Sequence, residues 1–252
     1  MSQHCLQGRP ERDLVWIQRR SVISAAAAWV ALGGWHGAQA QARTNIVQLQ
    51  GEASVNGQRL LPGHTIEPGD QIVTGPDAML VFVIGNDAFH VRKNSRLTVE
   101  RGNSNHLVGG LRLLTGAVAS VWGRGSQRQI STPTLTAGIR GTGTYAEVWP
   151  DQDYRSYFCN CYGTIDMAAG GDQLTSHASY HQSFWGEATP KGGHSLTPAG
   201  AINHTDEEIE FLAGLVKQQT AWQIEGRKGM KDGKGYMDEK PGRMHPAEMM
   251  GK

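Results

Sequence analysis

Two cysteines and two histidines in the second half of the chain are the side chains best suited to chemistry. Cys159 and Cys161 are separated by one residue, and His177 and His181 follow after the sequence Gly170-Gly171-Asp172. Alternate residues of a strand point to the same face, so both thiols are expected on one face. The Gly-Gly-Asp sequence predicts a hairpin that returns the histidines towards them. Thiolate and imidazole ligands together favour zinc or copper, so the pattern predicts a metal site.

The predicted geometry of this site depends on the register of the hairpin. A three-residue loop that pairs Ala169 with Gln173 places Cys161 opposite His181 and Ile165 opposite His177. A slip of one residue would turn the histidines to the other face of the sheet. Two alternatives to a metal site remain open: the cysteines form a disulfide or redox pair, although a bridge within an extended C-x-C is strained, or they are thiols with no special role.

The rest of the sequence gives little support for an enzymatic function. Residues 138–144 resemble a phosphate-binding loop, but a strand-like segment follows them where such a loop requires the start of a helix. The sequence contains neither G-x-S-x-G nor H-E-x-x-H. We therefore expect a protein without catalytic residues.

The first 42 residues are predicted to be an export signal. Arg19-Arg20 precedes a weakly apolar stretch and a run of small residues that ends at Ala42. The arginine pair resembles a twin-arginine motif, and an ordinary secretory signal is the alternative. The apolar stretch, residues 22–34, is shorter than the roughly 20 residues that span a bilayer. We expect a periplasmic or secreted protein, with no stable membrane span in the mature chain.

Removal of this signal leaves a nearly neutral chain. It retains 20 basic and 21 acidic residues, and Cys159 and Cys161 are its only cysteines. This near-equal number of basic and acidic residues does not favour a nucleic-acid partner, because nucleic acids normally bind to a basic domain or stripe. Two cysteines cannot form a disulfide scaffold, so about 210 residues must bury a core unaided, and that length is sufficient.

Short apolar runs alternate with turn sequences between residues 46 and 148. Glycine accounts for 33 of the 252 residues, and many of these glycines lie in the turns. Evenly spaced short strands predict a mainly β protein, built as a sandwich, a barrel or a β-solenoid. Helical bundles are disfavoured because glycine destabilises helix interiors.

Several motifs follow one another between residues 51 and 148: Val55-Asn56-Gly57, Leu61-Pro62-Gly63, residues 66–75, 94–99, 114–118 and 130–133, and Arg140-Gly141-Thr142. With these motifs in this order, residues 51–148 resemble the FecR domain. The resemblance implies an all-β, partly solenoid-like periplasmic module, and members of the sensor type link an outer-membrane receptor to a cytoplasmic sigma factor. The 18 residues before Arg19 are too few for an anti-sigma domain, so a stand-alone, exported FecR-domain protein is expected.

Five parts are predicted along the chain. The signal peptide (1–42) is followed by a FecR-like β domain (43–150), a hairpin extension with the cysteines and histidines (151–200), a short helix (201–224) and a flexible tail rich in Met, Gly and Lys (225–252). The helix is indicated by a capping box at residues 205–208 and by Ile209, Leu212 and Val216 at helical spacing, and we expect it to pack on the β domain. The thioethers of the tail could also bind Cu(I).

These observations predict a non-enzymatic, exported binding module for an envelope protein or a small ligand, with zinc or copper as the possible cofactor. The metal ligands would be Cys159, Cys161, His177 and His181. Two alternatives remain: a FecR-type signalling regulator of metal uptake, and a periplasmic thiol redox protein that uses the two cysteines. The absence of a C-x-x-C sequence at a helix N-terminus disfavours the redox protein.

Overall fold

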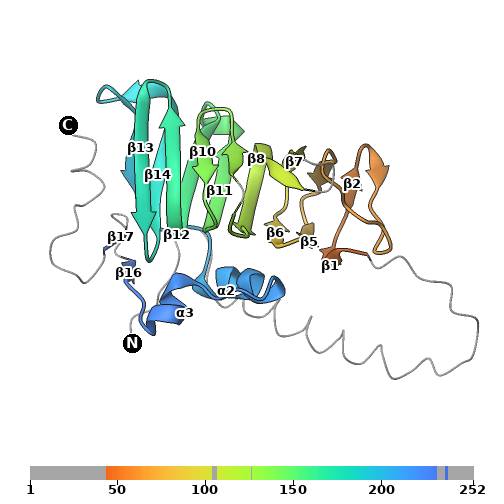
Figure 1. The fold of residues 1–252 in the computed structure, drawn as a ribbon. Coiled ribbons are helices and arrows are strands. Elements are labelled where there is room, and N and C mark those ends of the chain that lie inside the picture. Colours follow the sequence, from red (N-terminus) through yellow and green to blue (C-terminus); the bar gives the residue numbers. More distant parts are fainter. Residues whose placement is uncertain (1–43, 104–106, 126, 232–235, 238–252) are drawn as a thin grey trace, which may run out of the picture.

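The computed structural model describes residues 44–103, 107–125, 127–231 and 236–237. The predicted export signal and most of the predicted tail lie outside the described residues. Fifteen strands form one continuous sheet, and its strands follow one another along an elongated body (Figure 1). The prediction of a mainly β fold is confirmed.

Two long strands divide the sheet into two layers, because each pairs with different neighbours along its length. These are β8 (Val108–Val121) and β12 (Arg155–Ala169). The first layer also contains β1 (Ile46–Gln50), β5 (Met79–Ile84), β6 (Asp87–Val91), β11 (Gly143–Trp149), β14 (Gln182–Lys191) and β15 (His194–Ala199). The second contains β2 (Ala53–Val55), β3 (Gln58–Arg59), β4 (Gln71–Thr74), β7 (Arg96–Arg101), β9 (Arg128–Ser131), β10 (Thr136–Ile139) and β13 (Asp172–Ala178).

Glycines allow the two long strands to pass between the layers. Gly116 in β8 and Gly163 in β12 have φ angles of 77° and 104°, which other residues rarely adopt. A Cβ atom at Gly116 would lie 2.3 Å from Ser95 Oγ, and one at Gly163 would lie 2.3 Å from Thr142 Cγ2. Any larger residue at either position would therefore strain the crossing.

The main core lies between the two layers and combines strands from both. Phe82, Leu97, Ile130 and Phe158 are all fully buried in it. The apolar run at residues 79–84 was predicted to be buried on both faces, and Leu80, Val81 and Phe82 are at most 1% exposed. Burial of this extent supplies the main stabilisation of a fold that has no disulfide among its described residues.

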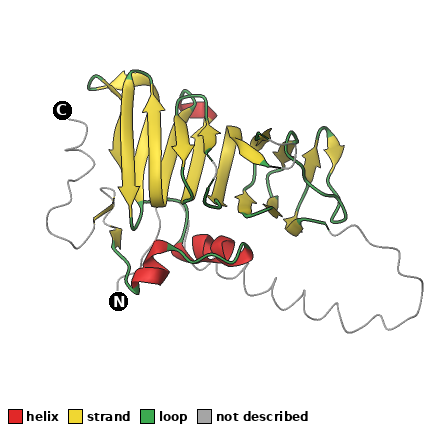
Figure 2. Ribbon diagram, viewed as in Figure 1, coloured by secondary structure: helices red, strands yellow, loops and turns green. Residues whose placement is uncertain are grey.

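Two helices cover the outer face of the first layer. Helix α2 (Asp206–Leu215) contacts β6, β8 and β11, and helix α3 (Ala221–Glu225) follows it. Both helices lie along the same side of the strands (Figures 1 and 2). A second core forms here, in which Ile209, Leu212 and Trp222 pack against the sheet.

The predicted short C-terminal helix is confirmed as α2. The Thr205 hydroxyl accepts a hydrogen bond from the Glu208 backbone N–H at 3.2 Å, as a helix cap should. Helix α3 has its own capping box at Thr220 and was not predicted as a separate element. The remaining short elements are a 3-10 turn at Pro150–Gln152 and the pair β16 (Met230–Lys231) and β17 (Tyr236–Met237). Among the described residues, no helix has the length and apolar character needed to cross a membrane.

Candidate metal centre

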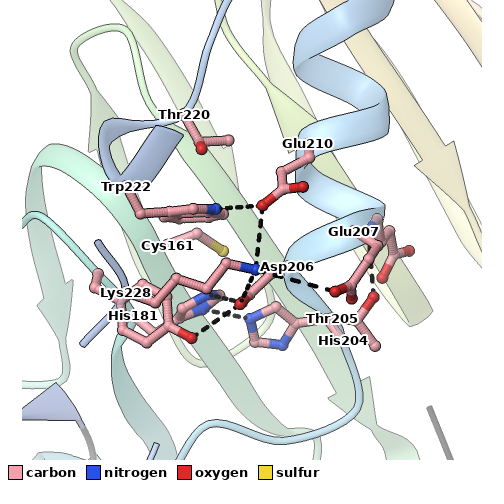
Figure 3. Close-up of polar contacts among 12 residues, drawn as sticks. Cys161, His181, His204, Thr205, Asp206, Glu207, Glu210, Thr220, Trp222 and Lys228 are labelled. Atoms are coloured by element: carbon pink, nitrogen blue, oxygen red, sulfur yellow. Dashed lines mark hydrogen bonds and ion pairs between the residues drawn. The ribbon is translucent and has the colours of Figure 1, made fainter. Parts of the chain in front are cut away.

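Four potential metal ligands converge between the first layer and the helices. Cys159 and Cys161 come from β12, His181 precedes β14, and His204 lies in the loop before α2. One ligand atom from each residue lies within 4.8 Å of the other three, and all four residues are fully buried. Figure 3 shows Cys161, His181 and His204 close together beneath Trp222. We call these four residues the Cys2His2 cluster.

The cysteines and His181 are held in position by irregular backbone conformations. The pairing of β11 with β12 skips Cys161, because Gly143 pairs with Tyr162 and Thr144 pairs with Asn160. Such a β-bulge re-aims side chains and is frequent beside functional sites. His181 has a φ of 31°, and its backbone N–H donates a hydrogen bond of 2.9 Å to the Cys161 carbonyl.

Each imidazole uses its outer nitrogen for a hydrogen bond that leaves the inner nitrogen available to the cluster. His204 Nδ1 lies 2.7 Å from the Ile202 carbonyl, which can only accept, so Nδ1 carries the proton. His181 Nε2 lies 2.9 Å from an Asp206 carboxylate oxygen and is a donor for the same reason. When both rings are neutral, the lone pairs of His181 Nδ1 and His204 Nε2 face each other across 3.0 Å, a contact that a proton or a metal cation between them would stabilise.

Asp206 is held in place by further polar groups. Its second carboxylate oxygen accepts from the Tyr180 hydroxyl at 2.9 Å and pairs with Lys228 Nζ at 2.9 Å (Figure 3). A carboxylate bound to the outer nitrogen of a histidine orients the ring and makes it a stronger ligand. The arrangement His181–Asp206 therefore has the form of the supporting shell found around metal-binding histidines.

Replacement of Asp206 by asparagine is expected to weaken metal binding by about 10- to 100-fold, because the amide keeps the shape of the carboxylate but not its charge. Competition of the purified protein with a metal-binding dye measures this affinity. Glu210→Gln is the matched control, since Glu210 also contacts Lys228, and its other bond in Figure 3 comes from the Trp222 ring N–H and not from a residue of the Cys2His2 cluster. Equal affinities for Asp206→Asn and the wild type would contradict a supporting role for this carboxylate.

The Cys159 thiol is prepared to bind a cation. Burial alone would raise its pKa, but a hydrogen bond from the Cys161 thiol and positive charge on the nearby His204 and His181 rings lower the pKa well below the usual value. The two sulfur atoms are 3.8 Å apart and are not bonded. Because the thiolate is the form that binds metal, the surroundings favour the ligating state.

Aromatic rings enclose the cluster. The Tyr145 ring stacks on His204, with centroids 4.7 Å apart and planes at 12°. The Trp222 ring stacks on His181, with centroids 5.2 Å apart and planes at 27°. The cluster is thus closed to solvent by Tyr145 from the sheet and Trp222 from α3.

His177 lies apart from the cluster, and the predicted hairpin register was wrong by one residue. β12 and β13 pair Ala169 with Asp172 across a two-residue turn, which Gly170 permits with a φ of 54°. The slip places Thr164 opposite His177, and Thr164 Oγ1 lies 3.0 Å from His177 Nδ1 on an exposed face. The structure therefore unites Cys159, Cys161 and His181 but not His177.

His181 nevertheless reaches the position opposite Cys161. The chain bends between β13 and β14, and β14 then pairs Gln182 with Asn160 in the originally predicted register. His204 was not found from the sequence. It directly precedes the recognised capping box at residues 205–208, and that neighbourhood was the one signal that could have drawn attention to it.

The fold and this cluster together define a mainly β protein with a buried cysteine–histidine centre that could hold a metal ion. No protein-family model and no curated protein matches the sequence. Two crystal structures of a "putative anti-sigma factor" from Parabacteroides distasonis are similar at 8% identity, with TM-scores of 0.41 and 0.42. The matches cover 56% and 59% of this chain and 63% and 65% of those chains.

Proposed function

We propose that this protein is an exported, non-enzymatic binding module that holds one zinc ion in a structural centre formed by Cys159, Cys161, His181 and His204. The observation that carries the proposal is the convergence of four buried ligand atoms within 4.8 Å of one another, three of whose six separations are close to the edges of a zinc tetrahedron. The two sulfur atoms are 3.8 Å apart, and Cys159 Sγ lies 3.5 Å from His181 Nδ1. His181 Nδ1 lies 3.0 Å from His204 Nε2. Bonds of about 2.3 Å to sulfur and 2.05 Å to nitrogen give tetrahedral edges of about 3.8, 3.6 and 3.3 Å.

The composition and closure of the cluster favour zinc in a structural role. A tetrahedral set of two sulfur and two nitrogen ligands is typical of zinc, whereas copper(II) prefers tetragonal geometry. Four protein ligands leave no position for water or substrate, and all four residues have no exposed surface. A closed centre supports a non-enzymatic protein. Thiol redox chemistry is also disfavoured, because an exchange partner must reach the sulfur.

The ion would join parts of the chain that are distant in sequence. The two thiolates belong to the sheet, whereas His204 lies two residues before the start of α2. Bound zinc would therefore fasten α2 and α3 to the outer face of the first layer. The signal-like residues 1–42 and the FecR-like motifs of residues 51–148 support a periplasmic module that binds an envelope protein or a small ligand.

Elemental analysis of the purified protein tests the centre. We expect one zinc per chain in the wild type, and less than a tenth of that in Cys161→Ser and His204→Gln. His177→Ala is the matched control, because His177 is an exposed histidine of the same hairpin, and it should retain one zinc. Circular dichroism establishes that each variant is folded. Full zinc content in Cys161→Ser, or none in the wild type supplied with zinc, would disprove the proposal.

Thiol titration separates the three states of the cysteines. Under denaturing conditions with a chelator, two reactive thiols are expected per mature chain, whereas a disulfide would give none. In the native protein, zinc-bound thiols should react slowly and become at least tenfold faster when the chelator is added. Buried thiols that bind no metal would react at the same rate with and without the chelator.

A further inference from the structure

Residues 217–228, which contain α3 and which we call the α3 segment, are attached to the rest of the molecule at few points. Trp222 is buried, whereas the other residues of α3 are at least partly exposed. A cleft of about 280 Å³ is lined both by residues of α3 and by residues of β12 and β13, so the helix is undercut on one side. Positive φ angles lie at the two ends of the segment, at Lys217 (57°) and Gly226 (69°). The segment thus has the form of a short strap with a single buried anchor.

The anchor, Trp222, is the part of the α3 segment that reaches the Cys2His2 cluster. It is only 2% exposed, and its ring stacks on His181 with centroids 5.2 Å apart. The rings of Tyr162 and Tyr180 meet it edge-on, with centroids 5.6 and 5.3 Å apart. Its ring N–H donates a hydrogen bond of 2.6 Å to Glu210 Oε1 on α2. Displacement of this one side chain would therefore uncover a face of His181 and leave every strand in place.

Lys228 fastens the end of the α3 segment to α2. Its Nζ lies 2.9 Å from an Asp206 oxygen, 3.3 Å from Glu210 Oε1 and 4.0 Å from Glu207 Oε1 (Figure 3). The Lys228 side chain is 44% exposed, so water can replace these contacts. Ion pairs with this degree of exposure are weak, and they break without a large loss of free energy.

All four candidate ligands lie outside the α3 segment. Both cysteines lie on β12, whereas His181 and His204 precede β14 and α2. Helix α2 has a separate attachment to the sheet, the buried ion pair between Glu208 and Arg92. The α3 segment can therefore move away while the ligands and α2 stay in position.

We propose that the α3 segment is a lid over the Cys2His2 cluster, and that a chelating partner reaches the bound ion only after Trp222 and Lys228 have moved away. This inference rests on the proposed zinc centre and adds the route by which the ion is exchanged. The four cluster residues have no exposed surface while the lid is closed. Closure of a lid excludes water and competing ligands from the site beneath it. The lid therefore protects the ion from direct attack.

Transfer of zinc from the loaded protein to the coloured chelator 4-(2-pyridylazo)resorcinol tests the lid. One part of the rate is independent of chelator concentration, because the ion dissociates by itself, and a second part is proportional to it, because the chelator attacks the ion directly. Trp222→Ala should raise the proportional part at least about tenfold, since it removes the buried anchor of the lid. Asp206→Asn, which weakens a ligand but leaves Trp222 in place, should raise mainly the independent part.

Two further variants complete the test. Lys228→Gln replaces an exposed side chain and should raise the proportional part about threefold. Ile224→Ala is the matched control, because Ile224 belongs to the same helix and is 63% exposed, and it should change neither part. Each variant should still hold one zinc per chain, since none replaces a ligand.

The outcomes separate the lid from the zinc centre. If the proportional part is the same in the wild type, Trp222→Ala and Lys228→Gln while each holds one zinc, the lid is disproved and the zinc centre stands. A wild type that binds no zinc would overturn both proposals.

Discussion

Removal of the proposed zinc ion from the purified protein is expected to release α2 and α3 from the sheet while the rest of the fold stays intact. Without a cation, two imidazole lone pairs face each other at 3.0 Å beside two sulfur atoms 3.8 Å apart. The loop that carries His204 can relieve this repulsion by moving away, and α2 begins two residues later. Structural zinc contributes about 10–16 kcal/mol in small zinc-finger peptides. Even a loss of about 5 kcal/mol would lower the Tm by about 10–20 °C in a chain of this size.

Hydrogen exchange before and after addition of a strong chelator measures this release. Amides of α2 should exchange at least about 100-fold faster without zinc, since their protection would then depend on local opening. Amides of β5 and β6 should change little, because their hydrogen bonds lie within the sheet. Chelator should have no effect on Cys161→Ser, which is expected to lack the ion. An identical melting temperature of the wild type with and without chelator would contradict a structural role for the metal.

Replacement of Glu208 by glutamine is expected to destabilise the protein by about 3–5 kcal/mol. Glu208 lies on α2 and forms an ion pair with Arg92, and the side chains of the two residues are 3% and 4% exposed. Its other oxygen lies 2.6 Å from His90 Nδ1. Removal of one partner leaves a charged guanidinium buried without compensation, which is far more costly than the loss of a surface pair. Urea denaturation gives the free energy of unfolding.

Glu52→Gln is the control for this experiment. Glu52 pairs with Arg59 at 3.6 Å, but the side chains are 82% and 74% exposed, so the change should stay within about 0.5 kcal/mol. A Glu208→Gln variant as stable as Glu52→Gln would contradict the assigned role of the buried pair. The combined variant Arg92→Met/Glu208→Leu should recover much of the loss, because it removes both buried charges.

Acidification should remove the stabilisation that the ionised Glu208 side chain contributes. Burial alone would raise the pKa of Glu208, but the charge of Arg92 and the hydrogen bond from His90 lower it from 4.5 to about 2. A lowered pKa in the folded state means that the stabilisation is complete above pH ~4.5 and declines as the pH falls towards ~2. The difference in unfolding free energy between the wild type and Glu208→Gln should therefore shrink by about 3 kcal/mol between pH 5 and pH 2. A constant difference over this range would contradict the shifted pKa.

Much of the fold could be predicted because local interactions determine it. Turn sequences and short apolar runs indicated the mainly β class, and the buried run at residues 79–84 became β5. The capping residues 205–208 indicated the start of α2, since a cap acts within a few residues of itself. For the site, alternation along a strand placed Cys159 and Cys161 on one face, and both belong to the same buried core.

Only the tertiary structure decided which histidines join the thiols. A two-residue turn at Gly170-Gly171 shifted the hairpin by one residue and left His177 exposed beside Thr164. A bend before β14 and the bulge at Cys161 then brought His181 to the cluster. His204 lies 43 residues after Cys161 and reaches it because α2 packs across the outer face of the sheet. Residue types and their local periodicity follow from the sequence alone, whereas register and the packing of distant segments depend on the free energy of the whole chain.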